Sequence, residues 1–181
     1  MSSRTNSLGL SLLLGFALST SAGAQSPAPD LSDAEVAHVA VTANSIDIAL
    51  ATLAQSRTHS HDVKQFAKTM RTDHGAVNAQ ASALATKLGV TPADNPVSQS
   101  LVKGAAEART GIEAAKGKAF DQAYIDREVA YHQAVLDALD TLLIPTTSNA
   151  ELKQLLVDVR PAFAAHLAYA KKLQGVLVAG R

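Results

Sequence analysis

The chain of 181 residues contains neither cysteine nor tryptophan, and aromatic residues make up only 4% of it. Without cysteine no disulfide can form, so the stability of the fold must come from its buried core. Alanine is abundant while aromatic residues are scarce. This combination favours closely packed helices over a β-sandwich.

Long hydrophobic runs are also scarce. The early run over residues 8–18 is shorter than the roughly 20 apolar residues that a helix needs to cross a bilayer, and we expect no later segment to reach that length. It follows Arg4 and precedes Ala22-Gly23-Ala24, the order typical of a secretory signal peptide. We therefore expect a signal peptide over residues 1–24 and a mature protein in the periplasm or secreted, with no integral membrane segment. No cysteine follows the cleavage point, which argues against a lipid anchor.

An excess of charge of either sign is missing as well. Removal of residues 1–24 takes away one of the 16 basic residues and none of the 16 acidic ones. Residues 25–181 therefore have a net charge of 15 − 16 = −1 with the histidines neutral. This balance gives no electrostatic case for a nucleic-acid partner. Motifs of common enzymes are absent too: no nucleophile elbow, metalloprotease motif, Rossmann fingerprint or phosphate loop is present, so a hydrolase is the weakest candidate.

Apolar residues recur in steps of three and four along four segments, which is the period of amphipathic helices. A polar, proline-containing linker over residues 25–31 precedes them. Capping and helix-breaking residues predict where these helices begin and end. The first runs from Ser32 or Asp33 to Arg57, and the second from Val63 to Leu88, before Gly89. The third runs from Asp121 to Leu143, before Pro145, and the fourth from a cap at Ser148 or Asn149 to about residue 176, with a kink at Pro161. Residues 177–181 form a C-terminal tail.

The segment between the second and third helices is long. Residues 99–116 are compatible with a helix but are interrupted by Gly104 and Gly111, so we expect a short connecting helix of low stability. Four long amphipathic helices predict an all-α four-helix bundle over residues 32–176. The pattern leaves open whether the long connection crosses over along the bundle or folds back.

Five polar residues interrupt the apolar stripes of these helices. His74, His132 and His166 lie within the stripes of the second, third and fourth helices, and Glu128 shares the face of His132. Asp47 lies at the shoulder of the first stripe. Imidazole and carboxylate groups are ligands for iron, zinc, manganese or copper(II), so these five residues are candidate ligands of a metal in the bundle core.

The heights of these residues can be compared by counting from the middle of each hairpin loop. Asp47 and His74 then differ by roughly 5 Å, and Glu128 and His166 by roughly 3 Å, so both pairs can meet in one layer. His132 falls roughly 9 Å from His166, and needs a long reach, a kink at Pro161 or a different role.

The competing interpretation is a polar network without metal, in which each histidine bonds a neighbouring carboxylate. Burying these groups without mutual compensation would cost several kcal/mol, so their shared placement calls for a network or an ion. The other histidines are weaker candidates: His38 is expected at a boundary, and His59 and His61 in a solvated turn with Ser60 capping the next helix.

Several of these residues belong to runs that resemble a known family. They are similar to the bacterial envelope family called domain of unknown function 4142, and they comprise the run from Val63 to His74, the Phe120-Asp-Gln-Ala-Tyr124 run, His132, and Pro161 with His166. The resemblance covers residues 34–175. It implies a ferritin-like helical bundle, in proteins often labelled as outer membrane proteins, with no established activity to transfer.

The resemblance also bears on the ligands. The family usually has glutamate where this chain has Asp47. The aspartate side chain is shorter and reaches less far towards a metal. Positions 71 and 163 are Arg71 and Phe163, so the Glu-x-x-His pairs of a di-iron centre are missing from the second and fourth helices. Beside the ligands we expect supporting roles for Asp73, Asp121 and Tyr124.

Two functions remain as hypotheses. The first is an exported bundle that binds a transition metal in its core and takes part in metal handling or oxidative defence. The second is a non-enzymatic envelope or stress protein that binds a partner, with the inward histidines forming only a structural network. Neither the oligomeric state nor the identity of the metal follows from the sequence.

Overall fold

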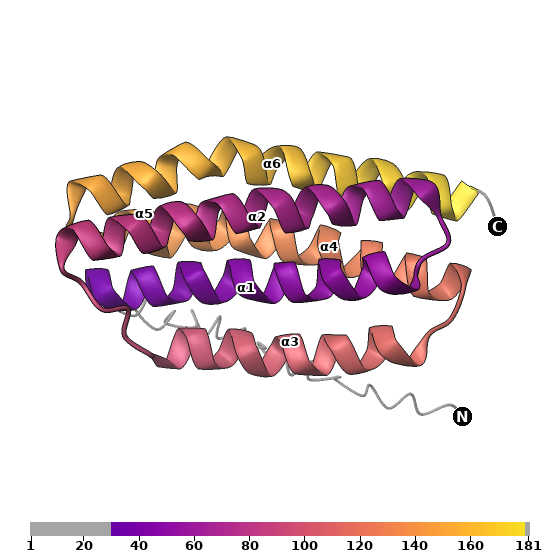
Figure 1. Cartoon of the computed structure of the whole chain (residues 1–181), viewed down its shortest axis with the longest axis horizontal. Coiled ribbons are helices and arrows are strands. Elements are labelled where there is room, and N and C mark those ends of the chain that lie inside the picture. The colour runs from indigo at the N-terminus through magenta and orange to yellow at the C-terminus, as the bar shows by residue number, and fades with distance from the viewer. Residues whose placement is uncertain (1–29, 180–181) are drawn as a thin grey trace, which may run out of the picture.

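A computed structural model describes residues 30–179 as a bundle of four long helices with a fifth helix along its side (Figure 1). The bundle helices are α1 (Asp33–Arg57), α2 (His61–Leu88), α4 (Lys118–Ala138) and α6 (Ala150–Ala179), and the side helix is α3 (Pro96–Ala114). This range contains no strand, and the predicted all-α class is confirmed. The predicted signal peptide and all but the end of the linker lie outside the described residues.

Capping residues set the helix ends close to where the sequence places them. Ser32 and Glu35 form a reciprocal capping box at the start of α1, and the Ser60 side chain caps α2. Gly89 ends α2 in the left-handed region at φ 64°, a conformation that costs glycine little. At α6 the Asn149 side chain accepts from the amides of Glu151 and Leu152. The helix then runs through Pro161 to Ala179, and so includes most of the predicted tail.

The end of the third bundle helix differs from the prediction. Beyond α4 the chain continues as a π-helical segment, η1 (Leu139–Leu143), and a last turn, α5 (Ile144–Thr146). Pro145 therefore lies inside the final turn instead of stopping the helix before it, because proline is tolerated in the first turn of a helical segment. The connection to α6 is thus centred near Ser148.

The direction of helix α3 shows how the long connection between α2 and α4 runs. At its start the side chain of Asn95 donates to the backbone carbonyl of Glu35 at 3.2 Å, and at its end Arg57 donates to the carbonyls of Glu113 at 3.0 Å and Ala115 at 2.8 Å. Helix α3 therefore runs along the side of the bundle parallel to α1 and antiparallel to α2 (Figure 1). As a result α2 and α4 point the same way, and the connection is a crossover.

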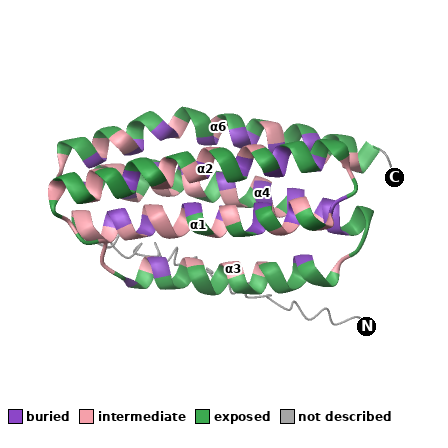
Figure 2. Cartoon of the chain, in the orientation of Figure 1, coloured by how far each residue is buried: buried purple, intermediate pink, exposed green. Residues whose placement is uncertain are grey.

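Two apolar clusters fill the bundle, one towards each end, and buried residues line the inner faces of the helices (Figure 2). On α1 one cluster ends at Val39 and the other begins at Leu50, and on α4 one ends at Ile125 and the other begins at Leu136. Buried polar residues occupy the interval between the clusters. The core is therefore divided by a polar layer near mid-length.

Helix α1 corrects one expectation about membrane segments. It contains an 18-residue window of mean hydropathy 1.4, and is long and apolar enough to cross a membrane by length and composition. Core helices of bundles meet the same criterion, and α1 packs against α2, α3 and α4. Its apolar residues therefore have an explanation within the fold.

Candidate metal centre

All five candidate ligands meet in the polar layer, and each bundle helix supplies at least one. Asp47 comes from α1, His74 from α2, Glu128 and His132 from α4, and His166 from α6. Asp47, Glu128 and His132 have no exposed surface, while His74 is 2% and His166 5% exposed. Antiparallel pairing within each hairpin brings these positions to one height, and periodicity turns them to the inner face of each helix.

The 9 Å height difference predicted between His132 and His166 does not keep their side chains apart. Their ring centroids are 5.4 Å apart. Because the chain stays helical through Thr146, the turn is centred at Ser148, so His132 lies 148 − 132 = 16 residues before it and His166 lies 166 − 148 = 18 after it. A difference of two residues is about 3 Å along a helix. His132 thus belongs to the same layer as the other ligands.

A buried asparagine fixes the orientation of His74. Asn44 Nδ2 donates to the carbonyl of Ala40 at 2.9 Å, which leaves Asn44 Oδ1 as the acceptor for His74 Nδ1 at 2.6 Å. The Nδ1 nitrogen of His74 therefore carries the proton and Nε2 carries the lone pair. Asn44 is not among the predicted site residues, although its position three residues before Asp47 puts it on the same side of α1.

The other two histidines follow the same pattern. His132 Nδ1 donates to the backbone carbonyl of Glu128 at 3.0 Å, so its Nε2 faces Nε2 of His74. His166 Nε2 donates to Asp73 Oδ2 at 2.9 Å, and its Nδ1 is buried without a hydrogen-bond partner. Asp73 thus contacts one of the candidate ligands, and its supporting role stays a prediction. In its neutral form each histidine therefore holds its proton on an outer nitrogen and turns the other nitrogen inward.

The inward atoms converge on a small space together with Asp47. His74 Nε2 and His132 Nε2 are 3.3 Å apart, and Asp47 Oδ2 lies 3.4 Å from the first and 3.6 Å from the second. Neither carboxylate oxygen of Asp47 has a hydrogen-bond partner among the described residues. Lone pairs that face each other at this distance repel unless a proton or a cation lies between them.

Burial and mutual charge shift the pKa values of these groups in opposite directions. Burial and the nearby carboxylate of Glu128 raise the pKa of Asp47 to about 8. Burial, with the positive charges of His132 and His166, lowers the pKa of His74 to about 2. Burial also lowers the pKa of His166. For His132 burial acts downward, but the hydrogen bond to Glu128 and the charges of both carboxylates outweigh it and raise the pKa.

Glu128 pairs with Arg127, which is not among the predicted site residues. Arg127 Nη1 donates to Glu128 Oε1 at 2.9 Å, and the Arg127 guanidinium stacks 3.7 Å from the ring centroid of Tyr131. Burial alone would raise the pKa of Glu128, but Arg127 and His132 outweigh it and lower the pKa. Adjacent positions on a helix point about 100° apart, so the pattern alone assigns Arg127 to another face. Its long side chain curls back to the carboxylate.

The remaining predicted residues lie at different distances from the centre. The Tyr124 hydroxyl is buried without a hydrogen-bond partner, and burial together with the charges of Glu128 and Asp47 raises its pKa well above the usual value. Asp121 is buried, but within the described range it makes no hydrogen bond or ion pair with a candidate ligand. His38 lies 3.8 Å from Asp94 at the bundle end, and His61 is an exposed neighbour of Asp62.

Two overlapping groups in this layer have donor atoms close enough to hold an ion. One contains His74, His132 and His166, the other contains Asp47, Glu128 and His132, and within each group the donor atoms lie within 4.8 Å of one another. His132 belongs to both groups. Nitrogen and oxygen donors of this kind suit zinc, copper(II), iron and manganese.

Solved structures with the same fold include proteins of quite different sequence. A DUF305 fragment from Deinococcus radiodurans superposes with a TM-score of 0.65 at 14% identity, covering 81% of this chain and 99% of that one. CopM in its Cu(II)-bound form superposes with a TM-score of 0.61 at 13% identity, covering 81% and 98%. At these identities the likeness shows the fold alone.

Sequence comparison gives the family. No curated protein matches this chain significantly. The family model described as "Domain of unknown function (DUF4142)" matches residues 18–173, which include all five residues of the polar layer and both motif runs. The chain therefore belongs to the DUF4142 family.

Proposed function

We propose that this protein binds one divalent transition-metal ion at the centre of its bundle, with His74, His132, His166 and Asp47 as ligands. The observation that carries the proposal is the triangle formed by His74 Nε2, His132 Nε2 and Asp47 Oδ2, with sides of 3.3, 3.4 and 3.6 Å. Metal–ligand bonds of about 2.0–2.2 Å in a tetrahedron give edges of about 3.3–3.6 Å. The three donors thus have the spacing of a tetrahedral face.

The hydrogen bonds behind the ligands support the same proposal. Metal-binding histidines commonly donate their other N–H to a carbonyl or carboxylate, which fixes the ring and its tautomer. Here Asn44, the Glu128 carbonyl and Asp73 receive these three protons. A fourth position is open to the free Nδ1 of His166. Glu128 itself is paired with Arg127, and we assign it the role of holding His132 in place.

Zinc and copper(II) are the two ions that fit best. Tetrahedral spacing is typical of zinc, whereas copper(II) has the higher intrinsic affinity for most nitrogen and oxygen donor sets. CopM, which shares the fold, has a copper(II)-bound form. Competition between the two ions at equal concentration, followed by elemental analysis of the protein, distinguishes them.

A set of four protein ligands favours metal handling over catalysis. Catalytic zinc sites keep a position for water or substrate, whereas closed sites hold the ion for structure, storage or transfer. The ligands here are at most 5% exposed. We therefore propose a non-enzymatic metal carrier or store.

The direct test measures the metal content of the purified, untagged protein. After removal of metal with a chelator and titration with zinc or copper(II), we expect one equivalent to be retained and the melting temperature to rise. His166→Ala should weaken binding at least 100-fold, while His38→Ala, which removes a histidine at the bundle end, should not. Absence of retained metal, together with no thermal shift for zinc, copper, iron or manganese, contradicts the proposal.

A substitution behind the ligands tests the geometry more finely. Asn44→Ala removes the acceptor of His74 Nδ1 without removing any ligand. Loss of such a partner typically lowers metal affinity 10–100-fold. Asn78→Ala is the matched control, because Asn78 only donates to the exposed Ser45 hydroxyl. Equal affinities for the two variants would show that the Asn44 hydrogen bond does not orient a ligand.

The second candidate is an interaction protein whose polar layer is held together by protons. The pKa of Asp47, raised to about 8, favours this reading, because a protonated carboxyl can donate to a histidine nitrogen at neutral pH. In that case His74→Gln and His166→Gln leave binding of an envelope partner intact, and added metal leaves the stability unchanged. A thermal shift with metal that both variants abolish decides for the first candidate.

We also propose that the protein acts in the periplasm or outside the cell. Residues 1–24 have the order of charge, apolar run and small residues that a signal peptide needs. Mass spectrometry of the protein from a bacterial host should find Gln25 at its N-terminus, and fractionation should find it outside the cytoplasm. An intact N-terminus on cytoplasmic protein would overturn this assignment.

A further inference from the structure

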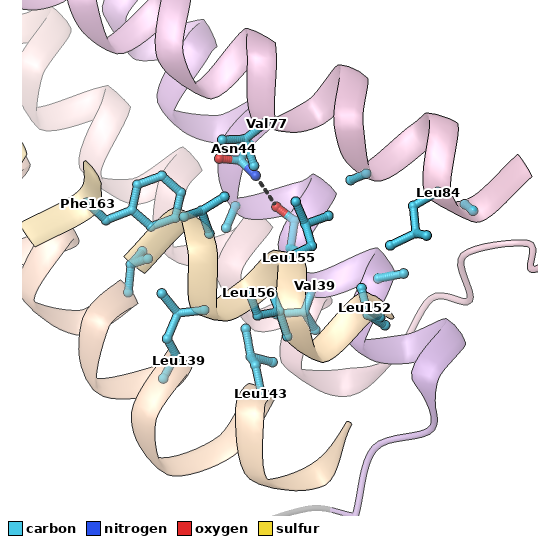
Figure 3. A pocket seen from close by; sticks show the side chains of 18 of the residues that line it. Val39, Asn44, Val77, Leu84, Leu139, Leu143, Leu152, Leu155, Leu156 and Phe163 are labelled. Atoms are coloured by element: carbon cyan, nitrogen blue, oxygen red, sulfur yellow. Dashed lines mark hydrogen bonds between the residues drawn. The ribbon is translucent and has the colours of Figure 1, made fainter. Parts of the chain in front are cut away.

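The half of the bundle near Gly89 contains an apolar cavity of about 150 Å³ beside the polar layer (Figure 3). Helices α1, α2, α4 and α6 and the π-helical segment surround it. Representative lining residues are Val39, Val77, Leu84, Leu139, Leu156 and Phe163. The lining also includes His74, whose ring stacks on that of Phe163 at a centroid distance of 4.9 Å. The cavity therefore ends at a candidate ligand.

The few polar groups in the cavity wall already have partners in the protein. Both side-chain atoms of Asn44 are hydrogen-bonded, to Ala40 and to His74, and the Tyr131 hydroxyl donates to the carbonyl of Ala43 at 2.8 Å. At the outer end Asp33 accepts from the backbone amides of Ser148 and Asn149. A water molecule needs two to four polar partners to be stable inside a protein. This cavity offers too few, so water gains little by entering it.

A dry cavity of this size suits one class of ligand. Apolar cavities of about 150 Å³ that exclude water bind xenon or benzene. We propose that this cavity is a binding site for one small apolar molecule of about the size of benzene, which packs against Phe163 and the edge of His74. The proposal does not depend on a bound metal.

We place the path into the cavity between α2 and α6. Val77 and Leu84 from α2 and Leu155 from α6 line the cavity and are only half-buried. Across the same two helices Lys87 pairs with Glu151, and both side chains are largely exposed. Exposed ion pairs contribute little to stability, so separating this pair to admit a ligand costs little.

Xenon and benzene are the probes, with the full-length mature protein as the sample. A crystal under xenon pressure should show xenon in this cavity, and benzene at about five times its Kd should raise the melting temperature by about 3 °C. Ala81→Leu places three more carbon atoms at a lining position and should abolish both effects. Ala83→Leu is the matched control, because Ala83 is exposed on the same helix.

The design separates loss of binding from loss of fold. If Ala81→Leu fails to fold, the smaller Ala81→Val should reduce xenon occupancy, and Leu156→Ala should increase it by enlarging the cavity. Binding of neither probe to the wild-type protein overturns the proposal, as does binding that Ala81→Leu and Ala83→Leu leave equal. Metal content measured on the same samples shows whether the metal site fails independently.

Discussion

Asp47 is a buried carboxyl group of the polar layer, and among the described residues neither of its oxygens has a hydrogen-bond partner. Its carboxylate has no exposed surface, and its pKa is raised to about 8 from an ordinary value of 3.8. A carboxyl whose pKa is higher in the folded than in the unfolded state binds more protons when folded between these two values. The folded state therefore loses stability as the pH rises from about 4 to about 8.

Asp47→Asn tests this directly in metal-free protein. The asparagine cannot ionise, so the variant does not lose stability in this way. The free energy of unfolding of the variant minus that of the wild type should therefore increase by about 1 kcal/mol for each pH unit between pH 5 and pH 8. Denaturant titrations at four pH values measure the difference. Parallel pH profiles for the two proteins would show that Asp47 does not hold a proton in the folded state.

Arg127 has the opposite role, since it stabilises a charge. Its side chain is 10% exposed and lies beside the fully buried carboxylate of Glu128. Arg127→Met leaves that carboxylate unpaired, and removing one partner of a buried pair typically costs about 3–5 kcal/mol. The matched control is Arg160→Met, which breaks an exposed pair with Asp140 and should change the unfolding free energy little. Equal effects of the two substitutions would contradict the buried role of Arg127.

At the residue scale the sequence indicates which side chains face inward but not what they touch. Periodicity identifies the three histidines, Glu128 and Asp47, because position along a helix fixes its face. It misses Arg127 and Asn44, whose contacts depend on side-chain rotamers and on the neighbouring helix. The tautomer of each histidine likewise depends on a partner from elsewhere in the fold.

At the scale of elements, caps and breakers predict most helix ends, and the exception is informative. Ser32, Gly89 and Asn149 act as caps, as predicted. Pro145 does not end its helix, because it lies in the first turn of α5, which follows the π-helical segment, and proline is tolerated there. This displacement of the turn explains why the sequence misjudges the height of His132.

Two glycines near the side helix α3 should respond oppositely to alanine. Gly104 lies exposed within α3 with open space around it, so Gly104→Ala should stabilise the protein by about 0.5–1 kcal/mol. Gly117 precedes α4 at φ 54° and ψ −133°, a region open almost only to glycine, so Gly117→Ala should destabilise by about 1–3 kcal/mol. Thermal unfolding compares them, and shifts of the same sign would contradict this account.

At the scale of the whole molecule the crossover by α3 determines which helices neighbour one another. It makes α2 and α4 parallel, and the polar layer then draws one or more ligand candidates from each of the four bundle helices. The side helix supplies none. Its buried residues are only Ser98 and Ile112. A metal ion in the layer would link the bundle helices while leaving α3 unlinked.

Hydrogen exchange can detect this division. Amides that exchange only by global unfolding should slow about 1,000-fold at a free zinc or copper(II) concentration of 1,000 times Kd, because the ion binds only the folded state. We expect such amides in α1, α2, α4 and α6. Amides of α3, with few buried contacts, should exchange through local opening and stay unchanged. His166→Ala is the control, because it should abolish the slowing by metal. Equal slowing of the amides of α3 and of the bundle helices would show that α3 unfolds only together with the bundle.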